Sequence, residues 1–423
     1  MSLLRPRDRG RPHDAYFRRL QAVLREHGPM RPALVVDLDA LDHNIDLVAA
    51  SVARGGKHLR LVEKSLPSPG LLGYILDRLS RHDGSAGQRL MSFHQPFLNQ
   101  DARHFPRADI LLGKPLPVRS AALFYREHAD HAGAAGSVFD PARQLQWLVD
   151  TPARLRDYLA LAEGLGTRLR INIELDVGLH RGGVADRETL RTMLEIIRDN
   201  PARLGFAGFM GYDPFVVMLP ALLGSRETLL ARVLSVYQEQ VALLHEAFPG
   251  LGTPAAGEPA PTFNTAGSPT YRLHEAERVS NDIAVGSALL MPAHFDIDTL
   301  AQHRPALFIA TPVLKTTGPV RIPGLGAGSR LLSWWDVNRR ETAFLYGGNW
   351  MADYVSPPGV HANSLYGRSS NQEIANVSPS AGLRVDDLVF LRPRQSEAVL
   401  LQFGELLAVR GDRLAERWPV YAD

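Results

Sequence analysis

Hydrophobic and polar positions follow two alternating patterns over the first two thirds of the chain. Short runs of consecutive apolar residues, typical of strands buried on both faces, alternate with amphipathic segments typical of helices. The first run is "PALVVDLDAL", and similar runs lie at 59–63, 89–93, 109–112, 144–149, 168–175, 204–211 and 283–286. The stretch "TFNTAG" at 262–267 is an ambiguous ninth strand candidate.

Helix start and stop signals fall between these runs. Residues 14–27 form an amphipathic pattern that is expected to pack beside the C-terminal part of the chain. Asp39 is expected to cap a helix that ends at Gly55, and Asp186 and Ser225 to cap two later helices. Alternating strands and helices predict a parallel α/β sheet, and eight or nine strands favour a closed (β/α)8 barrel.

The pattern changes after about residue 296. Short apolar runs such as "PALFIATPVLK", "TAFLYGG", "DLVFLRP" and "AVLLQFGELLAV" follow with no convincing helix between most of them. We therefore predict a barrel domain over 30–295 and a mainly antiparallel β domain over 296–423.

Composition narrows the functional classes. The 423 residues are 45% hydrophobic and 22% charged, with a net charge of +2, so charge gives no case for nucleic acid or an anionic membrane as partner. Cysteine is absent, which excludes disulfides, thiolate metal sites and a thiol nucleophile. The first residues lack the apolar segment of a signal peptide, and no apolar run could span a membrane, so the cytoplasm is the expected location.

Lysine is rare, which shortens the search for a lysine nucleophile. The four lysines are Lys57, Lys64, Lys114 and Lys315, and only Lys64 and Lys114 follow apolar strands. Barrel enzymes carry their active sites at the carboxyl ends of the strands, where a partly desolvated lysine can form a Schiff base. A structural lysine paired with Glu63 or a neighbouring carboxylate is the alternative.

Three glycine-bearing turns lie at other predicted strand ends. The turn "ELDVGLHRGGV" carries His180 and Arg181, and its glycines allow close approach of a ligand to the backbone. The loop "NTAGSPT" at 264–270 and the segment "DIAVGSALL" at 282–290 offer small residues and backbone N–H groups suited to a phosphate. Each could also be an ordinary turn, but together they predict an anion site at the barrel mouth.

These segments together resemble the fold-type III pyridoxal-phosphate enzymes, the alanine racemase-like barrels. Within that class the chain resembles the D-threonine aldolase and D-serine dehydratase-like family. The resemblance extends from about 31 to 420 and is carried by "RPALVVDLDALDHNI", "LRLVEKSLPSP" and "ELDVGLHRGGV". It implies a barrel of the alanine racemase type, pyridoxal 5'-phosphate as cofactor and a head-to-tail homodimer in which one subunit's β domain covers the other's barrel mouth.

The resemblance also implies roles for individual residues. Lys64 would form the internal aldimine with the cofactor. Arg181 would contact the cofactor's phenolic oxygen or the substrate carboxylate, and Tyr212 would lie beside the cofactor ring, although a core tyrosine fits the sequence equally well. The residues expected to hold the phosphate are Thr265, Gly267, Ser268, Gly286 and Ser287.

The chain departs from the family at the metal site, which the family builds from a histidine and a cysteine or aspartate. The matching stretch here is "RPRQSEAVLL", with Gln395 and Glu397 at the ligand positions. Glutamine is a poor zinc ligand, so a divalent metal is doubtful, with His361 and Glu397 as weak candidates. Without metal, Glu397 or His180 are the candidate catalytic bases.

The predicted function is a pyridoxal-phosphate-dependent lyase, an aldolase or dehydratase that acts on a D-configured β-hydroxy amino acid. The D preference comes from the resemblance alone. An amino-acid racemase or epimerase is a second possibility, with Tyr346 or Tyr366 from a partner subunit as the second acid. A non-catalytic pyridoxal-phosphate carrier is a third, although such carriers generally lack a C-terminal β domain.

Overall fold

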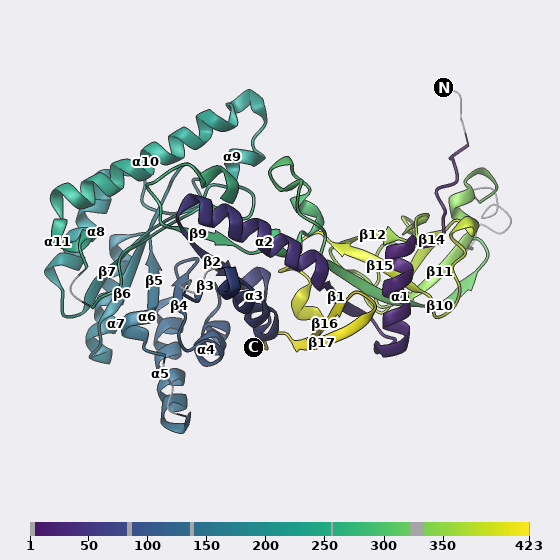
Figure 1. The fold of residues 1–423 in the computed structure, drawn as a ribbon, viewed down its shortest axis with the longest axis horizontal. Coiled ribbons are helices and arrows are strands. Elements are labelled where there is room, and N and C mark those ends of the chain that lie inside the picture. The colour runs from purple at the N-terminus through teal and green to yellow at the C-terminus, as the bar shows by residue number, and fades with distance from the viewer. Residues whose placement is uncertain (1–4, 83–86, 136–138, 255–256, 322–332, 423) are drawn as a thin grey trace. The chain divides into compact units, whose positions relative to one another are not determined.

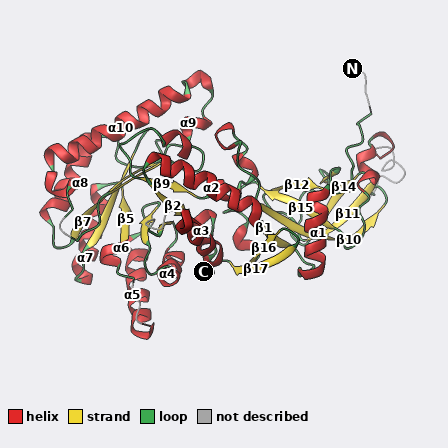
Figure 2. Ribbon diagram, viewed as in Figure 1, coloured by secondary structure: helices red, strands yellow, loops and turns green. Residues whose placement is uncertain are grey.

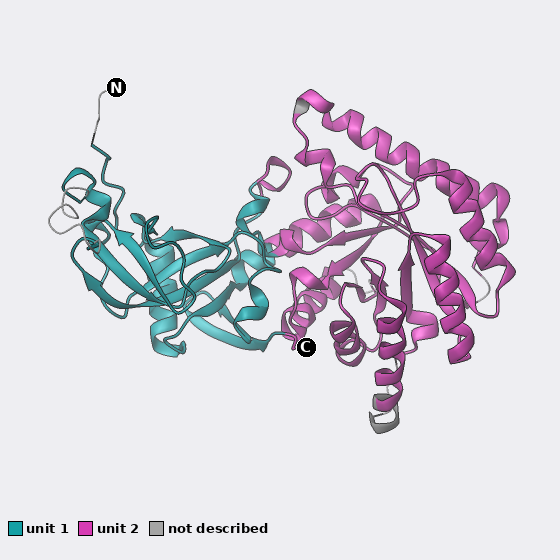
Figure 3. Cartoon of the chain, turned by 180° about the vertical axis from the view of Figure 1, so that it is seen from behind, with its two compact units in different colours: residues 1–43, 290–296, 303–420 teal, residues 44–289, 297–302, 421–423 magenta. Residues whose placement is uncertain are grey.

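The computed structural model describes residues 5–82, 87–135, 139–254, 257–321 and 333–422 (Figure 1). Contacts between residues divide the chain into two compact units (Figure 3). The barrel unit comprises residues 44–289, 297–302 and 421–423, and the β unit comprises residues 1–43, 290–296 and 303–420.

The barrel unit contains a closed barrel of eight parallel strands, as predicted. Helices enclose these strands (Figure 2). The strands are β2 (His58–Val62), β3 (Arg89–Ser92), β4 (Asp109–Leu112), β5 (Leu145–Val149), β6 (Leu169–Leu175), β7 (Leu204–Gly211), β8 (Thr262–Thr265) and β9 (Asp282–Val285). The main helices are α2 (Leu38–Gly55), α3 (Pro69–His82), α4 (Gln95–His104), α5 (Val118–Ala135), α7 (Pro152–Leu165), α8 (Arg187–Asp199) and α10 (Arg226–Ala247).

Short helical turns complete the barrel unit. They are η1 (Glu63–Ser65), α6 (Pro141–Gln144), α9 (Phe215–Met218), η2 (Ala221–Leu223), α11 (Pro249–Gly252), η3 (Tyr271–His274), α12 (Ser287–Leu290) and η5 (Asp298–Leu300). Asp186 and Ser225 cap α8 and α10 as expected. The cap of α2 differs from the prediction, because the Asp37 carboxylate accepts the N–H groups of Asp39 and Ala40.

A buried ionic layer lies at the amino ends of the barrel strands. Arg60 is fully buried, and its guanidinium contacts Asp282 at 2.9 Å and Asp109 at 2.7 Å. Arg170 also contacts Asp109, at 3.2 Å, and Gln146 donates hydrogen bonds to the same carboxylate. A barrel interior is a packed core, so this network closes the amino end and leaves ligand chemistry to the carboxyl ends.

The β unit contains a mainly antiparallel nine-stranded sheet, whose order is β13-β14-β11-β10-β1-β16-β17 with β15 and β12 branching from β10. Its strands are β1 (Ala33–Asp37), β10 (Leu307–Thr317), β11 (Glu341–Tyr346), β12 (Ala352–Ser356), β13 (Val360–Ala362), β14 (Gln372–Val377), β15 (Leu388–Pro393), β16 (Glu405–Arg410) and β17 (Arg413–Pro419). Short turns in it are η4 (Ala293–Phe295), η7 (Val337–Arg339), η8 (Pro379–Ala381) and η9 (Leu400–Gln402).

The strand β1 belongs to this sheet, although the sequence analysis counted its run in the barrel domain. It pairs antiparallel with β10 and parallel with β16. All five of its residues are buried, so the apolar run signalled burial without showing which sheet provides it. The eighth barrel strand is instead β8, the ambiguous "TFNTAG" segment.

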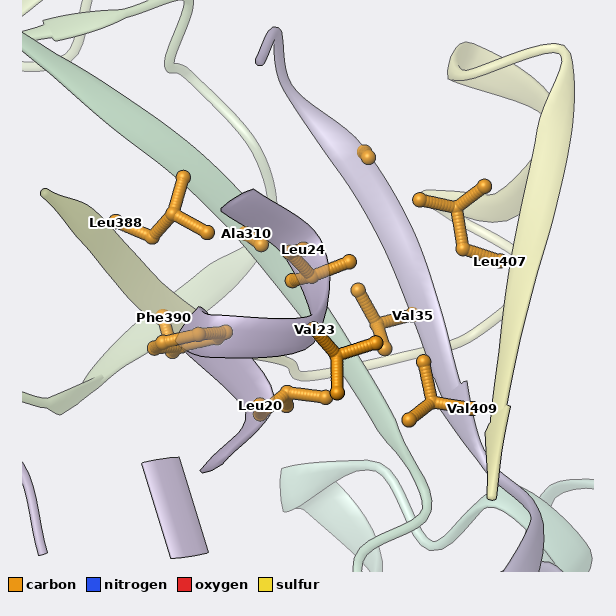
Figure 4. Packing of buried hydrophobic residues seen from close by; sticks show 10 residues of the cluster. Leu20, Val23, Leu24, Val35, Ala310, Leu388, Phe390, Leu407 and Val409 are labelled. Atoms are coloured by element: carbon orange, nitrogen blue, oxygen red, sulfur yellow. The ribbon is translucent and has the colours of Figure 1, made fainter. Parts of the chain in front are cut away.

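The N-terminal helix α1 (Ala15–His27) packs on the β sheet (Figure 4). The Asp14 side chain caps it by accepting the N–H of Phe17. The cluster that joins the helix to the sheet consists of Leu20, Val23, Leu24, Ala33, Val35, Ala310, Leu388, Phe390, Leu407 and Val409. Among the described residues, no helix combines the length and apolar character that a membrane crossing requires.

Candidate functional site

Lys64 lies two residues beyond the carboxyl end of β2, in the short turn η1. The turn separates two neighbouring side chains, since Glu63 is fully buried while Lys64 is exposed. The Lys64 Nζ atom lies 4.9 Å from the centroid of the Phe93 ring, which follows β3. Lys64 therefore lies at the barrel end where the sequence analysis placed it.

The remaining lysines have different environments. Lys57 is buried, and its Nζ atom lies 2.5 Å from the Glu277 carboxylate. Lys114 is exposed beyond β4, and Lys315 lies over the Phe344 ring in the β unit. The ion pair with Glu277 occupies the Lys57 amine, and Lys57 precedes β2, so it does not lie at the carboxyl end of a strand. Lys64 and Lys114 are thus the lysines placed at carboxyl ends of barrel strands.

The predicted phosphate residues come together at the ends of β8 and β9. The Ser268 hydroxyl accepts the backbone N–H of Gly286 at 3.2 Å and that of Ala288 at 3.0 Å. The Ser287 hydroxyl donates to the hydroxyl of Ser65 at 3.0 Å. Because Ser65 directly follows Lys64, this bond connects the end of β9 to the lysine turn.

The same loops contain positions that only glycine fits. A Cβ at Gly267 would lie 2.5 Å from the Tyr212 ring, and a Cβ at Gly286 would lie 2.9 Å from the Val62 carbonyl oxygen. The Thr265 hydroxyl is buried and has no hydrogen-bond partner in the part of the chain that the structure describes. Close backbone approach, hydroxyl groups and an unsatisfied buried oxygen fit the phosphate end of pyridoxal phosphate.

Arg181 and Tyr212 are neighbours at the ends of β6 and β7. The guanidinium carbon of Arg181 lies 5.2 Å from the centroid of the Tyr212 ring. Tyr212 is half-buried, and its ring is the neighbour that excludes a side chain at Gly267. We call residues 176–184 the arginine turn and residues 264–270 the first phosphate loop. Both therefore lie against the Tyr212 ring.

His180 differs from a buried catalytic base. Its side chain is 81% exposed, and its Nδ1 atom lies 2.8 Å from the Asp176 carboxylate. The Asp176 carboxylate also accepts the backbone N–H groups of His180 and Gly178. Burial opposes ionisation of Asp176, but these hydrogen bonds hold the pKa of its carboxyl group below the usual value. The direct structural effect of His180 is to shape the arginine turn.

Glu174, in strand β6, is a candidate that the sequence analysis missed. Its side chain is 9% exposed, and Gly182 of the arginine turn lies beside its carboxylate. Burial, together with the negative charge of Asp150, raises the pKa of Glu174 to about 7, and the Arg181 charge opposes this shift. Such a carboxyl group can gain or lose a proton near neutral pH. The only sign of it in the sequence was a charged residue inside an apolar run.

A buried network supports the first phosphate loop and was also missed. Asp213, next to Tyr212, accepts the Thr270 hydroxyl at 2.7 Å and lies 2.7 Å from His274 Nε2. The Thr270 hydroxyl accepts the N–H of Gly267, and His274 Nδ1 lies 3.5 Å from Glu277. Although burial disfavours the charged imidazole, Asp213 and Glu277 raise the pKa of His274 to about 9.

The candidates near the C-terminus lie in the β unit. Glu397 is half-buried and accepts the Ser396 hydroxyl at 3.1 Å. His361 lies on β13, where burial and the nearby charge of Arg339 lower the pKa of its imidazole. In the described ranges, no three or more histidine, cysteine, aspartate or glutamate side chains are grouped as a metal site.

Comparisons with known proteins agree with this architecture. A family model described as "Alanine racemase, N-terminal domain" matches residues 36–293, more than half of the chain. A search of curated protein sequences finds no match.

Several solved structures share the fold at low identity. The D-threonine aldolase from Filomicrobium marinum is 19% identical with a TM-score of 0.67, covering 92% of this chain and 94% of that one. The D-threo-3-hydroxyaspartate dehydratase from Delftia sp. HT23 is 19% identical with a TM-score of 0.63, over 93% and 97%. An alanine racemase from Bacillus anthracis with bound L-Ala-P is 14% identical with a TM-score of 0.65, over 92% and 97%. At these identities the likeness shows a shared fold that includes both units.

Proposed function

This chain belongs to the alanine racemase N-terminal domain family, with a barrel of that type and a second, mainly antiparallel β unit. On that premise we propose that it is a pyridoxal-phosphate-dependent lyase that acts on a D-configured β-hydroxy amino acid through Lys64. The observation that carries the proposal is the bond from Ser287 to Ser65, which connects the glycine-lined cradle of β8 and β9 to the lysine turn.

The lyase class is supported by the substrates in the names of two similar structures, D-threonine and D-threo-3-hydroxyaspartate. Threonine and 3-hydroxyaspartate both carry a hydroxyl group on the β-carbon, and both names specify the D series. Either retro-aldol cleavage or dehydration would suit such a substrate. A racemase is supported by the alanine racemase neighbour and by exposed Tyr346 and Tyr366 in the β unit.

Each site residue has a proposed part in this reaction. Lys64 would hold the cofactor covalently until the substrate amine replaces it. Thr265, Ser268 and the N–H groups near Gly286 would bind the phosphate, and Arg181 would neutralise an anionic oxygen beside the Tyr212 ring. When bound, the cofactor supplies an electron-poor ring that stabilises negative charge at Cα. His180 and Glu397 remain the proposed bases, and a divalent metal remains doubtful.

The test is covalent trapping of the cofactor followed by a substrate panel. We expect borohydride reduction in the presence of pyridoxal phosphate to leave a pyridoxyl group on Lys64, and none in Lys64→Arg. Lys114→Arg is the matched control and should still be labelled at Lys64. A label on Lys114 alone would contradict the proposal.

The panel separates the reaction classes. D-threonine should yield glycine and acetaldehyde if the enzyme is an aldolase, and D-threo-3-hydroxyaspartate should yield a keto acid and ammonia if it is a dehydratase. Interconversion of alanine enantiomers would indicate the racemase, and a labelled protein that turns over none of these would indicate a carrier.

A further inference from the structure

Two carboxyl groups are buried together next to the Lys64 turn. Glu63 and Asp101 both have 0% exposure. The Ser92 hydroxyl is a hydrogen-bond partner of both carboxyl groups, and it lies 3.4 Å from Glu63 Oε2. Glu63 Oε1 and Asp101 Oδ2 find no hydrogen-bond partner among the residues placed by the structure. Burial and mutual repulsion disfavour two negative charges here, so the pair keeps a proton.

The C-terminal tail supplies the strongest hydrogen bond to this pair. The Tyr421 hydroxyl donates to Asp101 Oδ1 at 2.5 Å, and the side chain is only 3% exposed. The tail is held in place because Tyr421 donates its N–H to the Pro67 carbonyl group at 2.9 Å. Its ring also lies 5.1 Å from that of Phe97. Pro67 lies three residues after Lys64, so the tail packs against the segment that carries the lysine.

The two carboxyl groups are not equivalent. Asp101 accepts a short hydrogen bond from a tyrosine, which favours its ionised form. Glu63 accepts a backbone hydrogen bond from Phe93 and has the longer contact to Ser92. Burial raises the pKa of Asp101 to about 7, while burial and then the Asp101 charge raise the pKa of Glu63 well above the usual value. The proton that the pair retains therefore resides on Glu63.

We propose that Tyr421, Asp101 and Glu63 form a proton-sharing cluster that keeps Glu63 neutral and thereby controls the charge state of Lys64. The hydroxyl of Tyr421 holds the negative charge on Asp101, so no anion forms on the residue that directly precedes the lysine. An ionised Glu63 would favour the ammonium form of Lys64, because the two charges attract each other. The three residues are positioning residues that act through Lys64, whose catalytic role rests on the proposed function.

The charge on Glu63 can be tested by the chemical reactivity of the Lys64 amine. The full-length protein is treated with hydroxylamine to release any bound aldehyde. It is then methylated with formaldehyde and cyanoborohydride between about pH 7 and about pH 10. Peptide mass spectrometry gives the labelling rate of Lys64 relative to exposed Lys114, which serves as the reference in the same molecule. Only the unprotonated amine reacts, so the pH profile reports the charge state of Lys64 without any cofactor.

The cluster predicts opposite effects for its two carboxyl groups. Tyr421→Phe and Asp101→Asn should each move negative charge onto Glu63 and slow the labelling of Lys64 by about threefold to tenfold at about pH 8. Glu63→Gln should not slow it, and adding Glu63→Gln to Tyr421→Phe should restore the rate. Tyr354→Phe is the matched control, because Tyr354 donates to buried Glu373 in the β unit and should leave the ratio unchanged.

Two results would overturn the inference. One is an unchanged ratio in both Tyr421→Phe and Asp101→Asn. The other is a shift in the same direction in Glu63→Gln as in these variants, which would indicate a loosened turn and no effect of charge. If pyridoxal phosphate fails to label any lysine while the labelling ratios change as expected, the proposed function fails and the cluster stands.

Discussion

Glu174 is a buried carboxyl group beside the arginine turn whose charge depends on pH near neutrality. The raised pKa of about 7 arises because burial and the negative charge of Asp150 both disfavour its carboxylate. Relative to the unfolded chain, this group stabilises the fold fully below about pH 4.5, and the contribution is lost as pH rises through about 7. The ionised form is partly compensated by Arg181, so the arginine turn and the carboxyl group are electrostatically coupled.

Glu174→Gln should therefore flatten the pH dependence of stability. We expect its melting temperature to change less than that of the parent protein between about pH 5 and about pH 8, and to be higher at the alkaline end. Exposed Glu188→Gln serves as the control and should follow the parent curve. Parallel curves for Glu174→Gln and the parent would show that this carboxyl group keeps an ordinary pKa in the fold.

Among single residues, the sequence predicted site residues that directly follow a strand. It missed those whose role depends on a partner far away in the sequence. Lys64, Arg181 and Gly286 follow strand runs directly, so position along one strand was sufficient. His274 lies 61 residues from Asp213, and Tyr421 lies 320 residues from Asp101. Contacts of this range depend on barrel closure and on the path of the tail, which hydrophobic periodicity does not contain.

The loop between β8 and η3 is the element on which the proposed phosphate site depends most. Its Gly267 and Thr270 are tied to Asp213, and Asp213 is tied to the imidazolium of His274. Burial opposes the charge on His274, but the two flanking carboxylates more than offset it, giving the pKa of about 9. This stabilisation is fully present below about pH 6.5 and is lost as pH rises through about 9.

His274→Asn should loosen this loop as well as the fold. Removing one partner of a buried ion pair is expected to cost about 3 kcal/mol of unfolding free energy, and to weaken pyridoxal phosphate binding measured by fluorescence. His82→Asn is the control, since His82 lies 2.8 Å from Asp46 in a solvent-exposed pair that contributes less than about 1 kcal/mol. Equal losses in the two variants would show that the His274 network does not hold the loop.

Elements with continuous apolar runs were predicted well, and elements with mixed surfaces were not. The barrel strands β5 and β6 are buried at every residue, which explains their clear signal. Six of the seven residues of β17 are exposed or half-buried, and three of the five residues of β12 are half-buried. Such strands pair through their backbones and carry little hydrophobic pattern, so the sequence did not reveal them.

Exposed apolar side chains gather at particular segments of the whole molecule. In the barrel unit they lie at the end of α9 and in η2, where Met218 is 72% and Leu222 is 95% exposed. In the β unit they include Trp334, Tyr346 and Leu365. Exposed apolar side chains that lie together commonly mark an interaction surface. Both units therefore present surface of the kind that the expected homodimer would cover.

We accordingly expect the full-length protein to sediment as a dimer at micromolar concentration. Leu222→Asp places a charge on the most exposed of these apolar side chains and should shift the sedimentation coefficient toward the monomer, because burying an unpaired charge at an interface is unfavourable. Leu165→Asp, at a 40% exposed position on α7, is the control for an added surface charge. A parent protein that sediments as a monomer would contradict the homodimer. A dimer unaffected by Leu222→Asp would place the interface elsewhere, with the β-unit surface around Trp334, Tyr346 and Leu365 as the next to substitute.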